Sequence, residues 1–153
     1  MAELTFLSIN EHPELARTLL EAVQANSDWR QVSGWLSQRL SECGGAPLPQ
    51  VWLCRNAAGE PVGYYALSDS EIIRGCPPGR AWLGILLIFD AHRGRKYSPI
   101  LLEHACAQAR ACGFPALYLV TEHVNYYERF GFDHIGGAVY EDGSPTKVYR
   151  RLL

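Results

Sequence analysis

The 153-residue chain lacks the features that mark membrane proteins, exported proteins and general nucleic-acid binders. Its longest apolar run, residues 82–89, is interrupted by Gly84 and falls far short of the roughly 20 residues that span a bilayer. The first residues are polar and acidic, where a signal peptide has a basic and then an apolar segment. Lysine and arginine number 14 against 16 aspartates and glutamates, so the net charge is −2 and no general excess of positive charge is present. We therefore predict a cytoplasmic protein without a membrane or nucleic-acid partner.

Cysteine and histidine lack the spacing that disulfide frameworks and metal sites require. The five cysteines are odd in number and include no C-x-x-C pair, which indicates reduced thiols. The five histidines are dispersed without ligand spacing, so we expect no metal. With 48% hydrophobic and 20% charged residues, the composition is that of a folded globular chain. The length then predicts a single domain over residues 1–153.

Hydrophobic periodicity and turn signals predict a mixed α/β fold. Strands are expected over residues 4–9, 51–55, 61–68, 82–89 and 116–120, and a closing hairpin over residues 132–140 and 146–152. Helices are expected over residues 13–24, about 32–42, where Cys43-Gly44-Gly45 ends the pattern, 98–112 and 121–130. Because the helix over residues 98–112 connects two buried apolar strands, we expect these two strands to be parallel.

Two of the predicted helices have distinct start signals. Ser98 followed by Pro99 combines a hydroxyl suited to the N-cap with a ring suited to the first helical position. Thr121 is the expected cap of a short helix through Phe130, and Gly131 is the expected stop.

A basic loop leads into the helix that begins at Ser98. Its basic residues are Arg93, Arg95 and Lys96, and Gly94 lies among them. A helix N-terminus presents unpaired N–H groups and partial positive charge, and a glycine allows a ligand to approach the backbone. This pattern predicts an anion site for a phosphate-bearing ligand. The chain contains neither a P-loop nor a G-x-G-x-x-G turn, and the alternative interpretation is a solvated loop that only caps a helix.

A second motif lies downstream of the basic loop. Leu117-Tyr118-Leu119-Val120-Thr121 precedes Asn125-Tyr126-Tyr127-Glu128-Arg129-Phe130-Gly131-Phe132. Together the two segments resemble the GNAT N-acetyltransferase superfamily, in which a Q/R-x-x-G-x-G/A loop wraps the pyrophosphate of acetyl-CoA. The later Tyr-Glu-Lys/Arg-x-Gly-Phe element of that family matches residues 127–132 at every position. The strong motif matches cover residues 82–132.

The resemblance implies a GNAT-like fold, with a single mixed, mostly antiparallel sheet flanked by about four helices and open where the cofactor enters. It also implies acetyl-CoA as co-substrate and no metal. The backbone of Leu86, Leu87 and Ile88 would pair with the pantetheine arm. The residues expected to hold the pyrophosphate are Arg93, Gly94, Arg95, Lys96, Tyr97, Ser98 and Pro99. The chain departs from the family pattern at Lys96, where glycine is expected, and at Ser98, where glycine or alanine is expected.

The activity implied by the resemblance is N-acetyl transfer to a primary amine of a small molecule or peptide, by direct attack in a ternary complex. Tyr127 matches the family's general-acid tyrosine, which would give a proton to the leaving thiolate. The neighbouring Tyr126 is interpreted as a packing residue. The amine must also lose a proton, and the candidates for accepting it are His123, Glu122, Glu71 or a water chain, unless the amine arrives neutral.

Two other functions stay open from the sequence. A non-catalytic acyl-CoA-binding module would keep the cofactor site without turnover. A surface for RNA or another polyanion would use the basic loop alone, although the net charge of −2 argues against it. The loops at about 25–35, 69–80 and 136–146 would choose the acceptor, and Glu42, Asp69 and Glu71 favour a cationic one. The resemblance also implies a homodimer.

Overall fold

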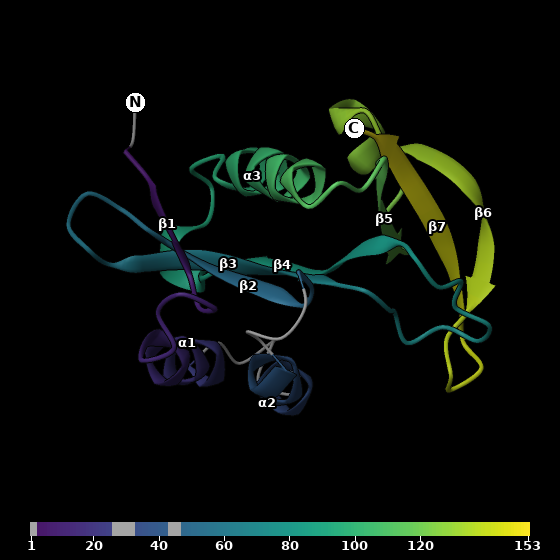
Figure 1. Cartoon of the computed structure of the whole chain (residues 1–153). Helices are drawn as coiled ribbons and strands as arrows, with labels where there is room; N and C mark the ends of the chain where they lie inside the picture. The colour runs from purple at the N-terminus through teal and green to yellow at the C-terminus, as the bar shows by residue number, and fades with distance from the viewer. Residues whose placement is uncertain (1–2, 26–32, 43–46) are drawn as a thin grey trace. The chain divides into compact units, whose positions relative to one another are not determined.

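The computed structural model describes residues 3–25, 33–42 and 47–153 (Figure 1). Its helices are α1 (Leu15–Gln24), α2 (Ser33–Glu42) and α3 (Ser98–Ala111), with the short 3-10 helices η2 (Asp90–His92) and η3 (Tyr127–Phe130). Its strands are β1 (Thr5–Ser8), β2 (Gln50–Arg55), β3 (Pro61–Ser68), β4 (Ala81–Ile88), β5 (Ala116–Thr121), β6 (Asp133–Val139) and β7 (Pro145–Leu152). None of the helices in these ranges is long and apolar enough to cross a membrane. The stop predicted at residues 43–45, and residues 26–32 of the predicted acceptor loop, lie outside the described residues.

The strands form one seven-stranded mixed sheet in the order β1-β2-β3-β4-β5-β7-β6. β4 and β5 are parallel, whereas β1 with β2, β5 with β7 and β6 with β7 are antiparallel. The predicted mixed sheet and the parallel crossover through α3 are therefore confirmed. The described residues contain three α-helices rather than about four, because the fourth predicted helix is much shorter than expected.

The predicted helix over residues 121–130 is wrong in its first half. Thr121 is the last residue of β5, and its Oγ1 accepts a hydrogen bond from the backbone N–H of His123 at 3.0 Å, which forms a turn rather than a helix cap. Asn125 has a φ of 62°, a left-handed conformation that an α-helix cannot contain. Only η3 forms, and Gly131 ends it with a φ of 84°, as predicted.

The start of α3 differs from the prediction by one residue. The backbone N–H groups of Ile100 and Leu101 donate to the carbonyl of Tyr97, at 3.0 and 3.1 Å. Tyr97 therefore occupies the N-cap position, and Ser98 is the first helical residue. The buried ring of Tyr97, 6% exposed, explains the shift, because packing fixes this residue where a hydroxyl cap was expected.

The chain forms two compact units. The first contains Met1–Ala66 and Ile85–Leu102, and the second contains Leu67–Gly84 and Glu103–Leu153. In the first unit, α1 and α2 lie on one face of the strands (Figure 1), where Leu19, Leu36 and Tyr64 belong to one buried apolar cluster. A single domain over residues 1–153 stays a prediction.

Gly63 on β3 faces the start of α3 within the first unit. A Cβ atom at this position would lie 2.5 Å from the carbonyl oxygen of Leu87 and 3.3 Å from Cδ2 of Leu101. Both distances are shorter than ordinary van der Waals contacts, and the first involves backbone. The close approach of β3, β4 and α3 therefore requires a residue without a side chain at position 63.

Candidate active site

The C-terminal half of β4 has a backbone edge that β5 does not pair. The ladder between the two strands contains two residue pairs, Ala81 with Leu117 and Trp82 with Tyr118. In the part of the chain that the structure describes, Leu86, Leu87 and Ile88 have no register partner in β5. The side chains of Leu87 and Ile88 are buried. The groups at this edge that can bind an extended ligand are therefore the backbone N–H and C=O groups.

The basic loop follows directly, through η2, and leads into α3. Gly94 and Lys96 both have left-handed backbone, with φ of 80° and 61°. The sequence pattern of the GNAT loop has glycine at position 96, and the backbone there has the conformation that favours glycine. Gly94, Arg95 and Lys96 are exposed at the N-terminus of α3, which is the arrangement that binds anions in proteins.

Arg93 has a different place from its basic neighbours. Its Nε donates to the carbonyl of Ile88 at 3.1 Å, and its Nη2 lies 3.1 Å from Oδ1 of Asp90. The guanidinium therefore ties the loop to the end of β4, and part of its charge is neutralised by a carboxylate. All three predicted basic ligands are exposed, and Arg93 differs from Arg95 and Lys96 because Asp90 takes up part of its charge.

The backbone strain at Lys96 leads to a stability prediction. A left-handed conformation costs a non-glycine residue about 1–2 kcal/mol, and part of this is offset because glycine has a more flexible unfolded state. We expect Lys96→Gly to raise the free energy of unfolding by about 0.5–1 kcal/mol in urea denaturation. Arg95→Gly, at a neighbouring position without left-handed backbone, is the control and should lower it. Equal losses for both variants would contradict strain at Lys96.

Tyr127, the predicted general acid, begins η3 in the second unit. Its ring lies among three aromatic rings, with centroids 4.9 Å from Tyr126, 5.8 Å from Phe132 and 6.5 Å from Tyr149. Burial, with a smaller contribution from Tyr126, raises the pKa of Tyr127 to about 12. The phenol is therefore protonated throughout the neutral and mildly alkaline range, as a proton donor must be.

Tyr126 has the surroundings of a packing residue. Its ring centroid lies 5.4 Å from that of Phe130 in an edge-to-face arrangement, and the guanidinium carbon of Arg129 lies 5.1 Å from it. The ring of His123 is 6.1 Å away. These contacts account for Tyr126 without a chemical role.

The three side chains predicted as bases have different surroundings. His123 is exposed, its backbone N–H donates to Thr121 and its carbonyl accepts from the Tyr149 hydroxyl at 3.4 Å. Oε2 of Glu122 accepts hydrogen bonds from the hydroxyls of Tyr140 and Thr146, both at 3.1 Å. Oε1 of Glu71 accepts from the backbone N–H of Ile72 at 2.9 Å. Both carboxylates thus accept hydrogen bonds that the sequence did not indicate, with Glu122 bound to residues 18 and 24 positions away and Glu71 to its own neighbour.

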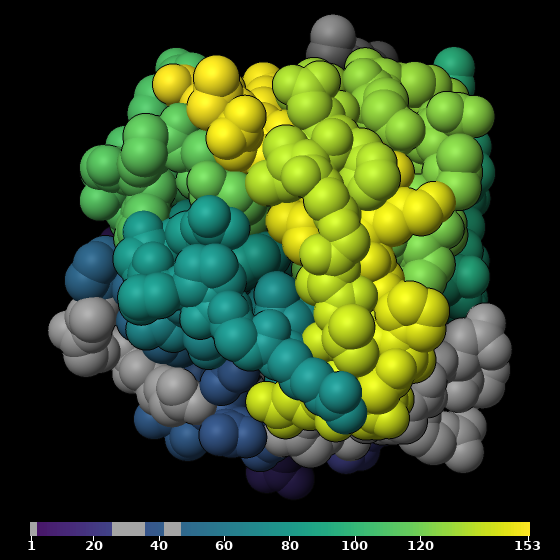
Figure 2. All heavy atoms as spheres, turned by 90° about the vertical axis from the view of Figure 1, so that its right-hand side faces the viewer, coloured from purple at the N-terminus to yellow at the C-terminus, as the bar shows by residue number. Residues whose placement is uncertain are grey.

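Glu122 also lines an open recess of about 540 Å³ in the second unit. Its other lining residues are Ile72, Tyr140, Glu141, Asp142 and Ser144. The segment before β4 forms one side, because the N–H of Arg74 donates to the carbonyl of Val139 at 2.8 Å and that of Glu141 to the carbonyl of Ile72 at 3.1 Å. Figure 2 shows this segment, in teal, against the yellow-green and yellow hairpin of β6 and β7. His123 is not among the lining residues.

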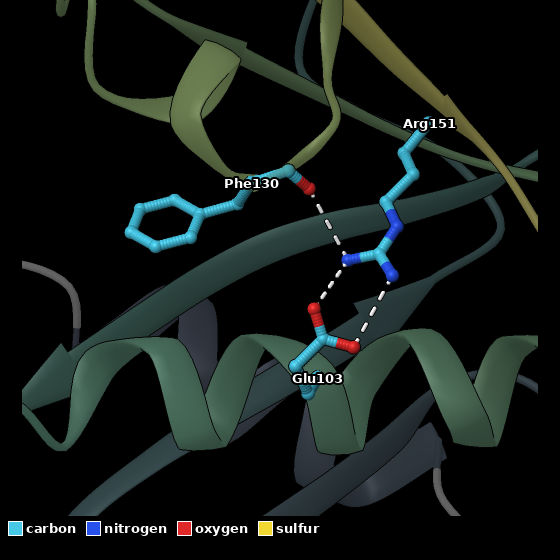
Figure 3. A network of polar contacts seen from close by, with 3 residues as sticks. All are labelled: Glu103, Phe130 and Arg151. Atoms are coloured by element: carbon cyan, nitrogen blue, oxygen red, sulfur yellow. Dashed lines mark hydrogen bonds and ion pairs between the residues drawn. The ribbon is translucent and has the colours of Figure 1, made fainter.

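One contact near Tyr127 is not indicated by the sequence. Arg151 on β7 binds both Glu103 on α3 and the carbonyl of Phe130, the last residue of η3 (Figure 3). Arg151 and Glu103 are 48 positions apart, and neither belongs to a motif. Only the fold brings them together.

Neither a metal cluster nor a disulfide is found in the described ranges. No three or more histidine, cysteine, aspartate or glutamate side chains come together there in a way that could hold a metal ion. The four cysteines in those ranges form no disulfide.

Comparisons with known proteins agree with the fold. Solved structures with the same fold include an acetyltransferase from Thermus thermophilus, with a TM-score of 0.70 and 21% identity over 98% of this chain and 97% of the other. An aminoglycoside 6'-acetyltransferase type Ii gives a TM-score of 0.69 and 13% identity over 98% and 96%. A GNAT family acetyltransferase from Elizabethkingia anophelis, solved with acetyl-CoA bound, gives 0.65 and 11% identity over 98% of each chain.

At these identities the likeness shows the fold alone, and no curated protein matches the chain in sequence. The family itself is shown by a sequence pattern that covers most of the chain. The pattern described as the acetyltransferase (GNAT) family matches residues 14–132, from just before α1 to the end of the motif that contains Tyr127. The chain belongs to the GNAT acetyltransferase family, and it is an acyltransferase.

Proposed function

We propose that this enzyme transfers the acetyl group of acetyl-CoA to a primary amine of a small molecule or peptide, by direct attack in a ternary complex. The observation that carries the proposal is the loop at the start of α3, where left-handed backbone at Gly94 and Lys96 presents exposed basic residues at a helix N-terminus. The acetyl-CoA bound in the Elizabethkingia anophelis structure supports the choice of cofactor.

The residues of β4 and of the basic loop have distinct roles in this proposal. The backbone of Leu86, Leu87 and Ile88 pairs with the pantetheine arm, as an added strand would. Arg95 and Lys96, with the N–H groups at the start of α3, hold the pyrophosphate. Arg93 orders the loop through Asp90 and the carbonyl of Ile88.

The transfer itself requires two proton movements. The amine nitrogen attacks the thioester carbonyl, the carbon–sulfur bond breaks, and the Tyr127 phenol donates its proton to the departing thiolate. The amine loses a proton to His123 or to water. His123 remains the predicted acceptor because its side chain is exposed, whereas Glu122 already accepts two hydroxyl hydrogen bonds.

Thermal stabilisation tests the cofactor directly. A ligand that binds the folded state adds RT ln(1 + L/Kd) to its stability, where L is the free ligand concentration, or about 2.7 kcal/mol at a hundredfold excess over Kd. We expect acetyl-CoA and desulfo-CoA to raise Tm, and ATP to raise it far less. An unchanged Tm at millimolar acetyl-CoA would contradict the proposal.

A panel of amines then separates catalysis from binding. Release of free CoA that depends on an added amine supports N-acetyl transfer. A raised Tm without turnover across small amines and peptides would instead favour a non-catalytic acyl-CoA-binding module. The cytoplasmic location and the homodimer stay predictions.

A further inference from the structure

Arg151 donates three hydrogen bonds within the second unit (Figure 3). Its Nη1 lies 2.6 Å from Oε1 of Glu103 and its Nη2 lies 3.2 Å from Oε2, so the two groups meet as a bidentate pair. The same Nη1 donates to the carbonyl of Phe130 at 3.2 Å. A planar guanidinium makes these bonds with two nitrogens, whereas a lysine ammonium has its donors on one nitrogen and cannot form the bidentate pair.

The carbonyl of Phe130 is the point where η3 ends. The last carbonyls of a helix have no partner within the helix, and η3, Tyr127–Phe130, has only four residues. A helix this short is unstable by itself and depends on contacts from outside. Arg151 provides one such contact, and its side chain also covers the turn at Gly131, where a Cβ atom would lie 3.6 Å from its Cδ.

Glu103 holds Arg151 in the orientation that this contact requires. The side chain of Arg151 is 24% exposed and that of Glu103 is 60% exposed. The hydrogen bond from Arg151 lowers the pKa of Glu103 despite partial burial, so the carboxylate is ionised at neutral pH. An exposed ion pair of this kind contributes little to global stability. Its main effect is therefore the orientation that it gives to the side chain of Arg151.

We propose that Arg151 is a positioning residue for Tyr127, which it acts on by anchoring η3 to α3 through Glu103. The inference rests on the proposed function, in which the Tyr127 phenol gives its proton to the leaving thiolate. Proton transfer and group transfer are sensitive to displacements of about 1 Å, so a loosened η3 costs rate rather than affinity for acetyl-CoA.

Arg151→Met tests this role, because it keeps an apolar side chain over Gly131 and removes all three hydrogen bonds. We expect kcat to fall about tenfold while KM for acetyl-CoA stays within about twofold. Arg151→Lys should recover part of the loss, since an ammonium keeps the charge and can donate hydrogen bonds but cannot form the bidentate pair with Glu103. Glu103→Gln, which keeps the acceptor oxygen, should lie between the wild type and Arg151→Met. Arg17→Met, which breaks an exposed ion pair with Glu21 on α1, is the control and should leave kcat unchanged.

A double-mutant cycle with Tyr127→Phe tests whether the effect passes through Tyr127. If Arg151 acts by placing the phenol, Arg151→Met lowers kcat much less in the Tyr127→Phe background than in the wild type. Equal losses in both backgrounds would overturn the proposal, because Arg151 would then act elsewhere.

Fluorine NMR of fluorotyrosine-labelled protein provides a readout that does not depend on activity. The Tyr127 signal is assigned by its loss in Tyr127→Phe, and Arg151→Met should shift or broaden it while Arg17→Met does not. An unchanged signal would overturn the positioning role. A shifted signal combined with unaltered kcat in Tyr127→Phe would support the anchoring by Arg151 and would refute the proton transfer assigned to Tyr127.

Discussion

Tyr127→Phe lowers kcat by about 10²–10³-fold and leaves the affinity for acetyl-CoA unchanged. The substitution removes one hydroxyl and keeps the ring that packs against Tyr126, Phe132 and Tyr149. The folded state is thus preserved, and the loss is confined to the proton that the departing thiolate needs. Steady-state rates of CoA release, with acetyl-CoA binding followed by calorimetry, measure the two quantities separately.

Tyr126→Phe is the matched control, since it removes the same hydroxyl from the adjacent ring. It should keep kcat within about twofold of the wild type, as expected for a side chain whose contacts are all of packing type. If Tyr127→Phe and Tyr126→Phe were equally active across a broad amine panel, Tyr127 would not be the acid.

The raised pKa of Tyr127 also leads to a prediction about how kcat depends on pH. A general acid works while it is protonated, and activity is lost as the pH rises through its pKa. With that pKa at about 12, the phenol keeps its proton at every pH where rates are measured. An alkaline loss of kcat near pH 8 or 9 would therefore belong to a different group, and Tyr127→Phe would lower the profile without moving that limb.

Gly63→Ala is expected to have the largest effect on stability. The new Cβ would lie 2.5 Å from the carbonyl oxygen of Leu87, which is backbone and cannot rotate away. Overpacking of this kind costs about 1–3 kcal/mol, and we expect the upper end of that range in urea denaturation. Because β4 must move to relieve the clash, affinity for acetyl-CoA should fall as well.

Gly137→Ala provides the comparison for this loss. Gly137 also lies in a strand, and its Cβ would meet only the carbonyl oxygen of Thr146, at 3.8 Å. We expect the free energy of unfolding to change by less than about 0.5 kcal/mol. A similar loss for both variants would show that any strand glycine is sensitive and that the contact with Leu87 has no special weight.

The strands were predictable because each is a short apolar or alternating run between turn signals. The apolar run from Trp82 to Phe89 is one such strand, and the observed β4 (Ala81–Ile88) agrees with it to within one residue. The helix that crosses from β4 to β5 was predictable for a similar reason, since buried residues such as Leu102 and Ala105 repeat at helical spacing.

The errors arise where tertiary contacts override local pattern. The sequence around Asn125 does not indicate that its backbone is left-handed. This conformation nevertheless shortens the predicted helix over residues 121–130 to η3. The cap of α3 moved to Tyr97 because its ring is buried. Arg151 and Glu103 look like ordinary surface charges, and their meeting depends on a contact across 48 positions. In contrast, Asp90 lies three residues before Arg93, and this ion pair could have been predicted from the sequence spacing.

Among the described residues, the edge at the end of β4 that β5 does not pair has a consequence for how this enzyme can diverge. Its hydrogen-bonding groups are peptide groups, which every amino acid except proline supplies in full. Mutations that exchange one apolar side chain for another along Leu86–Ile88 leave those groups in place. If the cofactor binds this edge as proposed, sequence drift along it leaves the binding groups intact.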